Sequence, residues 1–195
     1  GLDETLINDV CIQRMGQKLD EVFGFKVGQK RKNGKNFYEQ CYEITNHENV
    51  VVGDLCIGGQ ANSILVMLSG QGCMMGDYGW QNRLYNFLRS AQGAKITRLD
   101  LAHDDYEGTY LDIDDLNERE SMGEFYYFGK PARLSQFGDW KYMDRDKMGR
   151  TLQIGCRSSD KLLRAYEKGK QLGDKNSDWL RVEVELKAKH TLIPF

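Results

Sequence analysis

The segment Trp179–Lys187 alternates apolar and polar residues without a break. Every second residue is a branched aliphatic one, and these are Leu180, Val182, Val184 and Leu186. Because successive side chains of a strand point to opposite faces, the pattern predicts a strand with one face packed on a core and the other facing water. A chain that contains such a strand has to build a sheet around it.

A second predicted strand carries carboxylates. In the segment Arg98–Asp105, alternation places Asp100 and Asp104 on one face and the leucines on the other. If this strand pairs with residues 179–187, Asp100 and Glu183 converge on one face, where their repulsion favours a cation or raises one pKa. Two carboxylates near a strand end provide half of a hard-metal site. The alternative is a solvated strand face with an Arg–Asp pair.

A helix is predicted from Ser158 or Ser159, either of which would cap it, to about Leu172. Within this helix Tyr166 shares a sector with two leucines. Such a tyrosine usually belongs to the core, but one that faces the sheet would place its hydroxyl over the carboxylates. Another sector is basic and suits phosphate oxygens; it contains Arg157, Lys161, Arg164 and Lys168.

The remaining segments predict an α+β fold with a central, mostly antiparallel β-sheet and helices packed on it, in a single domain over residues 1–195. Further helices are predicted at residues 6–23, 80–92 and 112–120, and further strands at 37–44, 50–57, 62–68 and 150–156; the strand that carries the carboxylates is expected to begin at Lys95. Lys26–Lys35 is expected to form a loop or exposed hairpin turn, and Ser69–Cys73 a Gly-rich bend. Residues 122–148 give no firm assignment.

Composition excludes several classes of protein. None of the five cysteines lies two or three residues from another, so there is no zinc-ribbon spacing, and the odd count predicts reduced thiols in a cytoplasmic protein. No phosphate loop with Lys-Ser/Thr is present, which argues against ATP hydrolysis. The net charge is −2, so contact with nucleic acid would depend on local basic patches. The longest aliphatic run, Ile64–Leu68, is too short to cross a bilayer.

Four segments, taken in order, resemble the replication initiation factor family of rolling-circle replication proteins, which includes initiators of staphylococcal plasmids and RstA-like proteins of filamentous phages. The segments are Leu68–Cys73, Thr97–Asp104, Gly149–Gly155 leading to Leu163–Lys168, and Trp179–Glu183. The related HUH endonucleases hold a metal with a His-hydrophobic-His strand. Here Asp100-Leu101-Ala102 occupies the comparable strand, so carboxylate would replace imidazole.

The resemblance implies an HUH-nuclease-like fold that nicks one DNA strand at a replication origin. Tyr166 would be the nucleophile and would end in a 5′-phosphotyrosine link, and Lys168 would neutralise phenolate or phosphate charge. Oxygen ligands favour Mg²⁺ or Mn²⁺. The metal ligands implied are Asp100 and Glu183, with Asp104 or Asp105 as a third.

The DNA-binding residues expected are Arg157, Lys161 and Arg164, with the loop Lys26–Lys35 as a second contact. The partners that go with this function are single-stranded or hairpin origin DNA, a host helicase and a second copy of the chain. Known relatives are longer, so the native protein is expected to continue beyond Phe195 with a part that helps to recognise the origin.

Three alternatives stay open. A conjugative relaxase would use the same chemistry for another purpose. A non-catalytic DNA-binding regulator of the same fold would need neither a metal nor the Tyr166 hydroxyl. In a purely structural α+β domain, the acids would be surface groups and Tyr166 a core residue.

Overall fold

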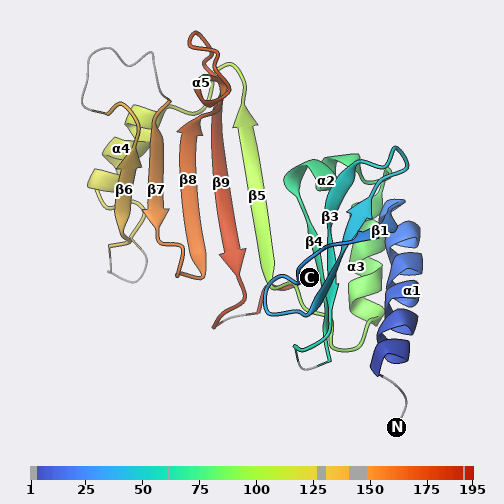
Figure 1. Cartoon of the computed structure of the whole chain (residues 1–195). Helices are drawn as coiled ribbons and strands as arrows, with labels where there is room; N and C mark the ends of the chain where they lie inside the picture. The colour runs from blue at the N-terminus through green and yellow to red at the C-terminus, as the bar shows by residue number, and fades with distance from the viewer. Residues whose placement is uncertain (1–3, 61, 127–130, 141–148, 191) are drawn as a thin grey trace. The chain divides into compact units, whose positions relative to one another are not determined.

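The computed structural model describes residues 4–60, 62–126, 131–140, 149–190 and 192–195. The chain forms two compact units, Gly1–Ala94 and Lys95–Phe195, and each has its own antiparallel sheet (Figure 1). The predicted α+β class is confirmed. Two sheets, however, stand where the sequence predicted one central sheet, and each unit has its own core.

The first unit is a four-stranded sheet with strand order β1-β2-β3-β4. Its strands are β1 (Lys26–Lys30), β2 (Gln40–Thr45), β3 (Val51–Ile57) and β4 (Ile64–Leu68), and its helices are α1 (Glu4–Phe23), α2 (Gly70–Met75) and α3 (Trp80–Ser90). Residues of α1 and α3 pack on Ile44 and Leu55, which share one face of the sheet. The apolar residues that gave the helices their periodicity and the branched residues of the strands thus pack together in a single core.

Three sequence predictions for this unit are wrong. The segment Lys26–Lys35 was expected to form a loop or an exposed hairpin turn, but its first half is strand β1 and only its second half lies in the connection to β2. The Gly-rich bend begins helix α2, which Ser69 caps by accepting a hydrogen bond from the Gly72 N–H at 2.9 Å. A Cβ at Gly72 would lie 2.3 Å from the Val52 carbonyl oxygen, so this helix start needs glycine.

The third concerns the cysteines. Cys41 and Cys56 are direct cross-strand partners on β2 and β3, and they form a disulfide. The sequence missed it because the two residues are 15 positions apart and only the strand register brings them together. The prediction of reduced thiols is therefore wrong for this pair, while Cys11, Cys73 and Cys156 are free thiols.

The second unit is a five-stranded sheet with strand order β5-β9-β8-β7-β6. Its strands are β5 (Arg98–Asp105), β6 (Leu134–Phe137), β7 (Thr151–Gly155), β8 (Lys161–Glu167) and β9 (Leu180–Lys187), and its helices are α4 (Ile113–Ser121) and α5 (Lys168–Gln171). The strictly alternating segment Trp179–Lys187 contains β9, and it pairs with β5 as expected.

The predicted helix from Ser158 to Leu172 is wrong. Residues Lys161–Glu167 form strand β8, which is hydrogen-bonded to β7 on one side and to β9 on the other. Leu, Arg and Ala favour helix as isolated residues, but here β9 pairs with the whole segment and β7 pairs with residues 162–166. The basic stripe that a helix would have created therefore does not exist.

Helix α4 covers one face of this sheet. Asp112 caps it by accepting hydrogen bonds from the N–H groups of Asp114 and Asp115. Ile113 and Leu116 pack on Leu152 and other buried residues of the same face. The β5 end of the face is more open, since Leu101 is 53% exposed and His103 on the same face is exposed as well.

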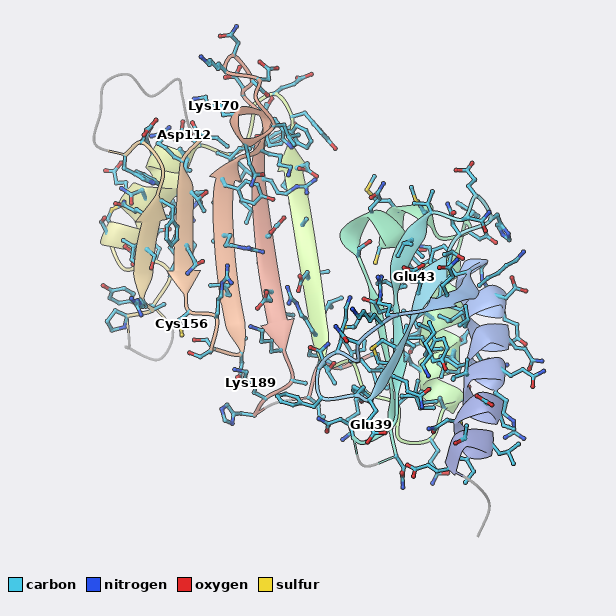
Figure 2. The ribbon with its side chains drawn as sticks, in the orientation of Figure 1. Glu39, Glu43, Asp112, Cys156, Lys170 and Lys189 are labelled. Atoms are coloured by element: carbon cyan, nitrogen blue, oxygen red, sulfur yellow. A yellow bond between two sulfur atoms is a disulfide. The ribbon has the colours of Figure 1, made fainter. Side chains whose placement is uncertain are left out.

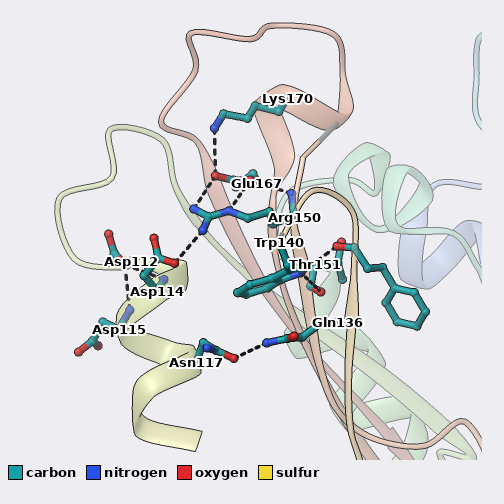
Figure 3. A network of polar contacts seen from close by, with 11 residues as sticks. Asp112, Asp114, Asp115, Asn117, Gln136, Trp140, Arg150, Thr151, Glu167 and Lys170 are labelled. Atoms are coloured by element: carbon teal, nitrogen blue, oxygen red, sulfur yellow. Dashed lines mark hydrogen bonds and ion pairs between the residues drawn. The ribbon is translucent and has the colours of Figure 1, made fainter. Parts of the chain in front are cut away.

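A buried ion-pair network ties α4 to the sheet (Figure 3). Arg150, only 7% exposed, donates to Glu167 at 3.2 Å and to Asp114 at 2.7 Å. Lys170 donates to the same Glu167 at 3.1 Å, and the Arg150 guanidinium lies over the Trp140 ring. Burial alone would raise the pKa of Glu167, but the hydrogen bonds from Arg150 outweigh it and lower that pKa.

Among the described residues, no helix is both long enough and apolar enough to cross a membrane.

Candidate active site on the polar face of the second sheet

The face of the second sheet opposite α4 is built from cross-strand rows of polar side chains, and we call it the polar face. Directly paired residues of adjacent strands share a face, so the register gives the rows. One row consists of Phe137, Thr151, Tyr166, Arg181 and Asp104. The next consists of Ser135, Gln153, Arg164, Glu183 and Ala102. A third, shorter row consists of Gly155, Leu162, Glu185 and Asp100.

Tyr166 and Glu183 meet at the centre of this face. The Tyr166 hydroxyl donates a hydrogen bond to Glu183 Oε1 at 2.6 Å. Burial and this carboxylate raise the pKa of Tyr166 to about 12, because both disfavour the phenolate. The phenol is thus neutral at pH 7, with its proton already directed at a potential acceptor.

Arginines hold the two residues in place. Arg164 donates to the second oxygen, Glu183 Oε2, at 2.8 Å. Arg181, the direct cross-strand partner of Tyr166, lies 3.8 Å from Glu183 Oε1. Its charge opposes the rise in the Tyr166 pKa, so Arg181 would stabilise a phenolate if one formed.

Asp104, proposed from sequence as a third metal ligand, fixes Arg181 instead. It accepts two hydrogen bonds from the Arg181 guanidinium at 2.7 Å each and a third from the Trp179 indole at 2.6 Å. These contacts, Arg181 first, lower the pKa of Asp104. Asp105 points to the other face and accepts backbone N–H groups of Thr109, Tyr110 and Leu111, so it is not part of the site.

Asp100 lies on the polar face, diagonal to Glu183. Its direct partner is Glu185, while Ala102 stands opposite Glu183. Arg98 binds Asp100 through two hydrogen bonds, at 2.8 and 2.6 Å, and reaches Glu185 at 2.6 Å. Arg98 and Asp100 are half exposed, so these contacts can be exchanged for others at little cost.

The donor chemistry of this face fits a hard divalent cation. Asp100, Glu183 and Glu185 offer carboxylate oxygens, which Mg²⁺ and Mn²⁺ prefer. Each carboxylate is engaged by an arginine or lysine here. Over the residues that the structure describes, no three acidic, His or Cys side chains are already gathered as ligands.

The other residues predicted for the site lie apart from the Tyr166 hydroxyl. Lys168 Nζ is 5.7 Å from the centre of the Tyr166 ring and donates to Gln171, so it faces the ring instead of the oxygen. Lys161 is exposed at the start of β8. Arg157 lies in the turn before β8, where its carbonyl accepts a hydrogen bond from Lys187.

Sequence reasoning missed Arg181 and the Arg98–Glu185 pair. The signal for Arg181 was present, since it lies two residues before Glu183 on the polar side of a strictly alternating strand. What the sequence did not give was the register, which sets Arg181 opposite Tyr166 and Asp104.

These features define an α+β protein with an antiparallel sheet whose polar face presents a phenol–carboxylate pair among arginines. A solved structure that this chain resembles is the rolling circle replication initiator protein from Geobacillus stearothermophilus. It is 28% identical to this chain, with a TM-score of 0.66, and the match covers 90% of this chain and 65% of that one. The chain therefore spans somewhat less than two thirds of this neighbour.

The model of the replication initiation factor family matches residues 94–195, which is just over half of the chain and takes in the whole second unit. The chain belongs to this family. Comparison with curated protein sequences gave no match.

Proposed function

We propose that this chain initiates rolling-circle replication by nicking one DNA strand at an origin, with Tyr166 as the nucleophile. The observation that carries the proposal is the 2.6 Å hydrogen bond from the Tyr166 hydroxyl to Glu183 on the polar face. Membership of the replication initiation factor family and similarity to a rolling circle initiator support it.

In the proposed reaction the Tyr166 oxygen forms a bond to the scissile phosphorus, and the bond from phosphorus to the 3′ oxygen breaks. Glu183 takes the phenol proton, and the leaving 3′ oxygen takes a proton from solvent. The product is a 5′-phosphotyrosine link and a free 3′-hydroxyl that can prime synthesis. Arg181 and Arg164 lie where they would offset the negative charge that builds up in the transition state.

A phenol of such high pKa is a weak nucleophile and needs activation. Asp100 and Glu183 would hold Mg²⁺ or Mn²⁺. When bound, the cation would neutralise charge on the scissile phosphate. Asp104 contributes indirectly, because it fixes the guanidinium of Arg181.

The experiment looks for the covalent product. The protein is mixed with Mn²⁺ and a pool of single-stranded oligonucleotides labelled at the 3′ end, and denaturing gels are scanned for labelled protein. We expect an adduct with the wild type and none with Tyr166→Phe. Tyr110→Phe, which removes the hydroxyl of an 84% exposed tyrosine in the same unit, is the matched control and should keep the adduct.

An adduct that persists in Tyr166→Phe would contradict the proposal. Cleavage without any adduct would also contradict it, because water would then be the nucleophile. The absence of both reactions, with DNA binding retained, would favour a non-catalytic regulator.

A further inference from the structure

A groove of about 480 Å³ opens on the polar face beside the phenol–carboxylate pair. It extends over β6, β7 and β8 and the turn that follows β7. We call it the arginine groove, and its main lining residues are Arg133, Phe137, Gln153, Cys156, Arg157 and Arg164. All of them belong to the second unit.

The charge of the arginine groove suits an anion. Three guanidinium groups line it, and none of the described lining residues is acidic. Arginine binds phosphate oxygens through paired N–H groups, so it recognises phosphate more specifically than lysine does. Gln153 and the neighbouring hydroxyl groups of Ser135 and Thr151 add neutral donors and acceptors, which suit the edge of a base.

Phe137 gives the groove an aromatic wall. It lies on the edge strand β6 and is 54% exposed, although exposure of an apolar ring to water does not stabilise the fold. Proteins that bind single-stranded nucleic acid present such rings, because any unpaired base can stack on them. In a duplex the faces of the bases are already stacked on each other, and this contact is lost.

The row Phe137–Thr151–Tyr166 connects the ring to the reacting hydroxyl. Phe137 is two strands away from Tyr166, a distance of about 10 Å at the usual strand spacing. Arg164 belongs to both places, since it lines the groove and binds Glu183. A DNA strand with its scissile phosphate at Tyr166 would therefore bring a neighbouring nucleotide into the groove.

We propose that the arginine groove binds one nucleotide of single-stranded DNA next to the scissile phosphate, with its phosphate held by Arg133 and Arg157 and its base stacked on Phe137. The proposal rests on the proposed nicking function and extends it to the recognition of the flanking strand. It also predicts that the substrate has to be unpaired on this side of the nick.

Cys156 provides a probe inside the groove. It lies in the turn that joins β7 and β8 (Figure 2). Hydrogen bonds from Ser158 and Ser159 lower its pKa to about 7, so much of it is thiolate at neutral pH and reacts with alkylating agents. Cys73, in the first unit, is the internal control, because burial raises its pKa.

The experiment measures alkylation of each cysteine by iodoacetamide, using mass spectrometry on the full chain carrying Tyr166→Phe, so that no DNA is cleaved. The additions compared are a single-stranded oligonucleotide, the same sequence as a duplex, and inorganic phosphate. We expect the single strand to slow alkylation of Cys156 at least several-fold and to leave Cys73 unchanged. Duplex and phosphate should protect much less.

Variants give a second measurement. Phe137→Ala should weaken binding of the single strand about 5- to 150-fold, the equivalent of one lost stacking contact, and Arg133→Ala should flatten its salt dependence. Phe37→Ala, which removes a ring that is 90% exposed in the first unit, is the matched control and should bind like the parent.

Equal protection by the duplex or by phosphate alone would overturn the proposal, as would an oligonucleotide that binds fully to Phe137→Ala and leaves Cys156 reactive. The covalent adduct of the wild type is scored separately. An adduct without protection of Cys156 would refute the groove alone, whereas protection without an adduct would refute the nicking chemistry alone.

Discussion

The two units each place a carboxylate on the sheet face away from their helices, but the side chains that contact the two carboxylates differ. In the first unit, Asp54 is 9% exposed and binds Arg31 and Lys35, the latter at 2.6 Å. Burial alone would raise the pKa of Asp54, but these two cations outweigh it and lower that pKa. In the second unit, Glu183 shares its oxygens between a cation and the Tyr166 phenol.

Under the proposed function, the difference separates a structural carboxylate from a reactive one. Asp54 has its charge fully matched by permanent cations, so it can hold a loop onto the sheet but has nothing to exchange. Glu183 faces a group that can give up a proton, in a partly exposed place that a phosphate can reach. An ion pair by itself therefore does not indicate a candidate active site. What distinguishes Glu183 is the neighbouring phenol and the access to solvent.

The largest effect is expected from Glu183→Gln. The amide keeps the shape and still accepts a hydrogen bond, but it cannot take the phenol proton. Adduct formation should fall about 10²- to 10⁴-fold, the usual contribution of a general base, while the melting temperature changes little. Single-turnover rates with a labelled oligonucleotide measure it. If the variant nicks at the wild-type rate, Glu183 is a structural carboxylate like Asp54 and not a general base.

The opposite result is expected from Asp54→Asn. It leaves Arg31 and Lys35 beside a neutral amide, so the free energy of unfolding should drop by about 2 to 3 kcal/mol. Adduct formation at 25 °C should be unchanged. Urea denaturation followed by fluorescence gives the first quantity and the gel assay the second. A loss of nicking without a loss of stability would show that the first unit also carries chemistry.

Asp100 and Asp104 test the distinction within one sheet. Asp100 is bound by Arg98, and both side chains are half exposed, whereas Asp104 is held by Arg181 and Trp179 much as Asp54 is held by its cations. Asp100→Asn should weaken Mn²⁺ binding about 10- to 100-fold or more, and Asp104→Asn should leave it unchanged while slowing the adduct a few-fold. Calorimetric titration with Mn²⁺ decides, and equal losses in both variants would make Asp104 a ligand.

The sequence predicted the meeting of Tyr166 and Glu183 although it assigned Tyr166 to the wrong element. Alternation in β9 was strong enough to place Glu183 on the polar side. For β8, helix-favouring residues such as Leu163 and Ala165, together with a chance spacing of basic residues, pointed to a helix. Local propensity contains no information about the two strands that flank this segment in the sheet.

The other misses share this cause. The Cys41–Cys56 disulfide, the row from Phe137 to Tyr166, and the pairing of Arg181 with Asp104 all depend on strand register. Register is set by the packing of the whole sheet, so a single sequence read segment by segment gives the faces of strands but not their partners.

The smallest effect is a pH dependence of stability. Glu167 is the counterpart of Asp54 in the second unit: it is 9% exposed, held by Arg150, and has a pKa below its ordinary value of 4.5. A lowered pKa in the folded state stabilises the fold above the ordinary value, and this contribution is lost as the pH falls through the lowered value. The wild-type free energy of unfolding should therefore decline below about pH 4.5.

Glu167→Gln should remove part of this decline, so the two curves converge in acid and differ by about 1 to 3 kcal/mol at neutral pH. Urea denaturation at a series of pH values measures it, and Glu48→Gln, at an exposed position of the first unit, should follow the wild-type curve. Curves that stay parallel down to acid pH would mean that the Arg150 network does not discriminate between charged and neutral Glu167. Carboxylates such as Glu167 and Asp54 would then stabilise the fold through hydrogen-bond geometry and not through their charge. The loss of unfolding free energy in Asp54→Asn should then also be the same at every pH.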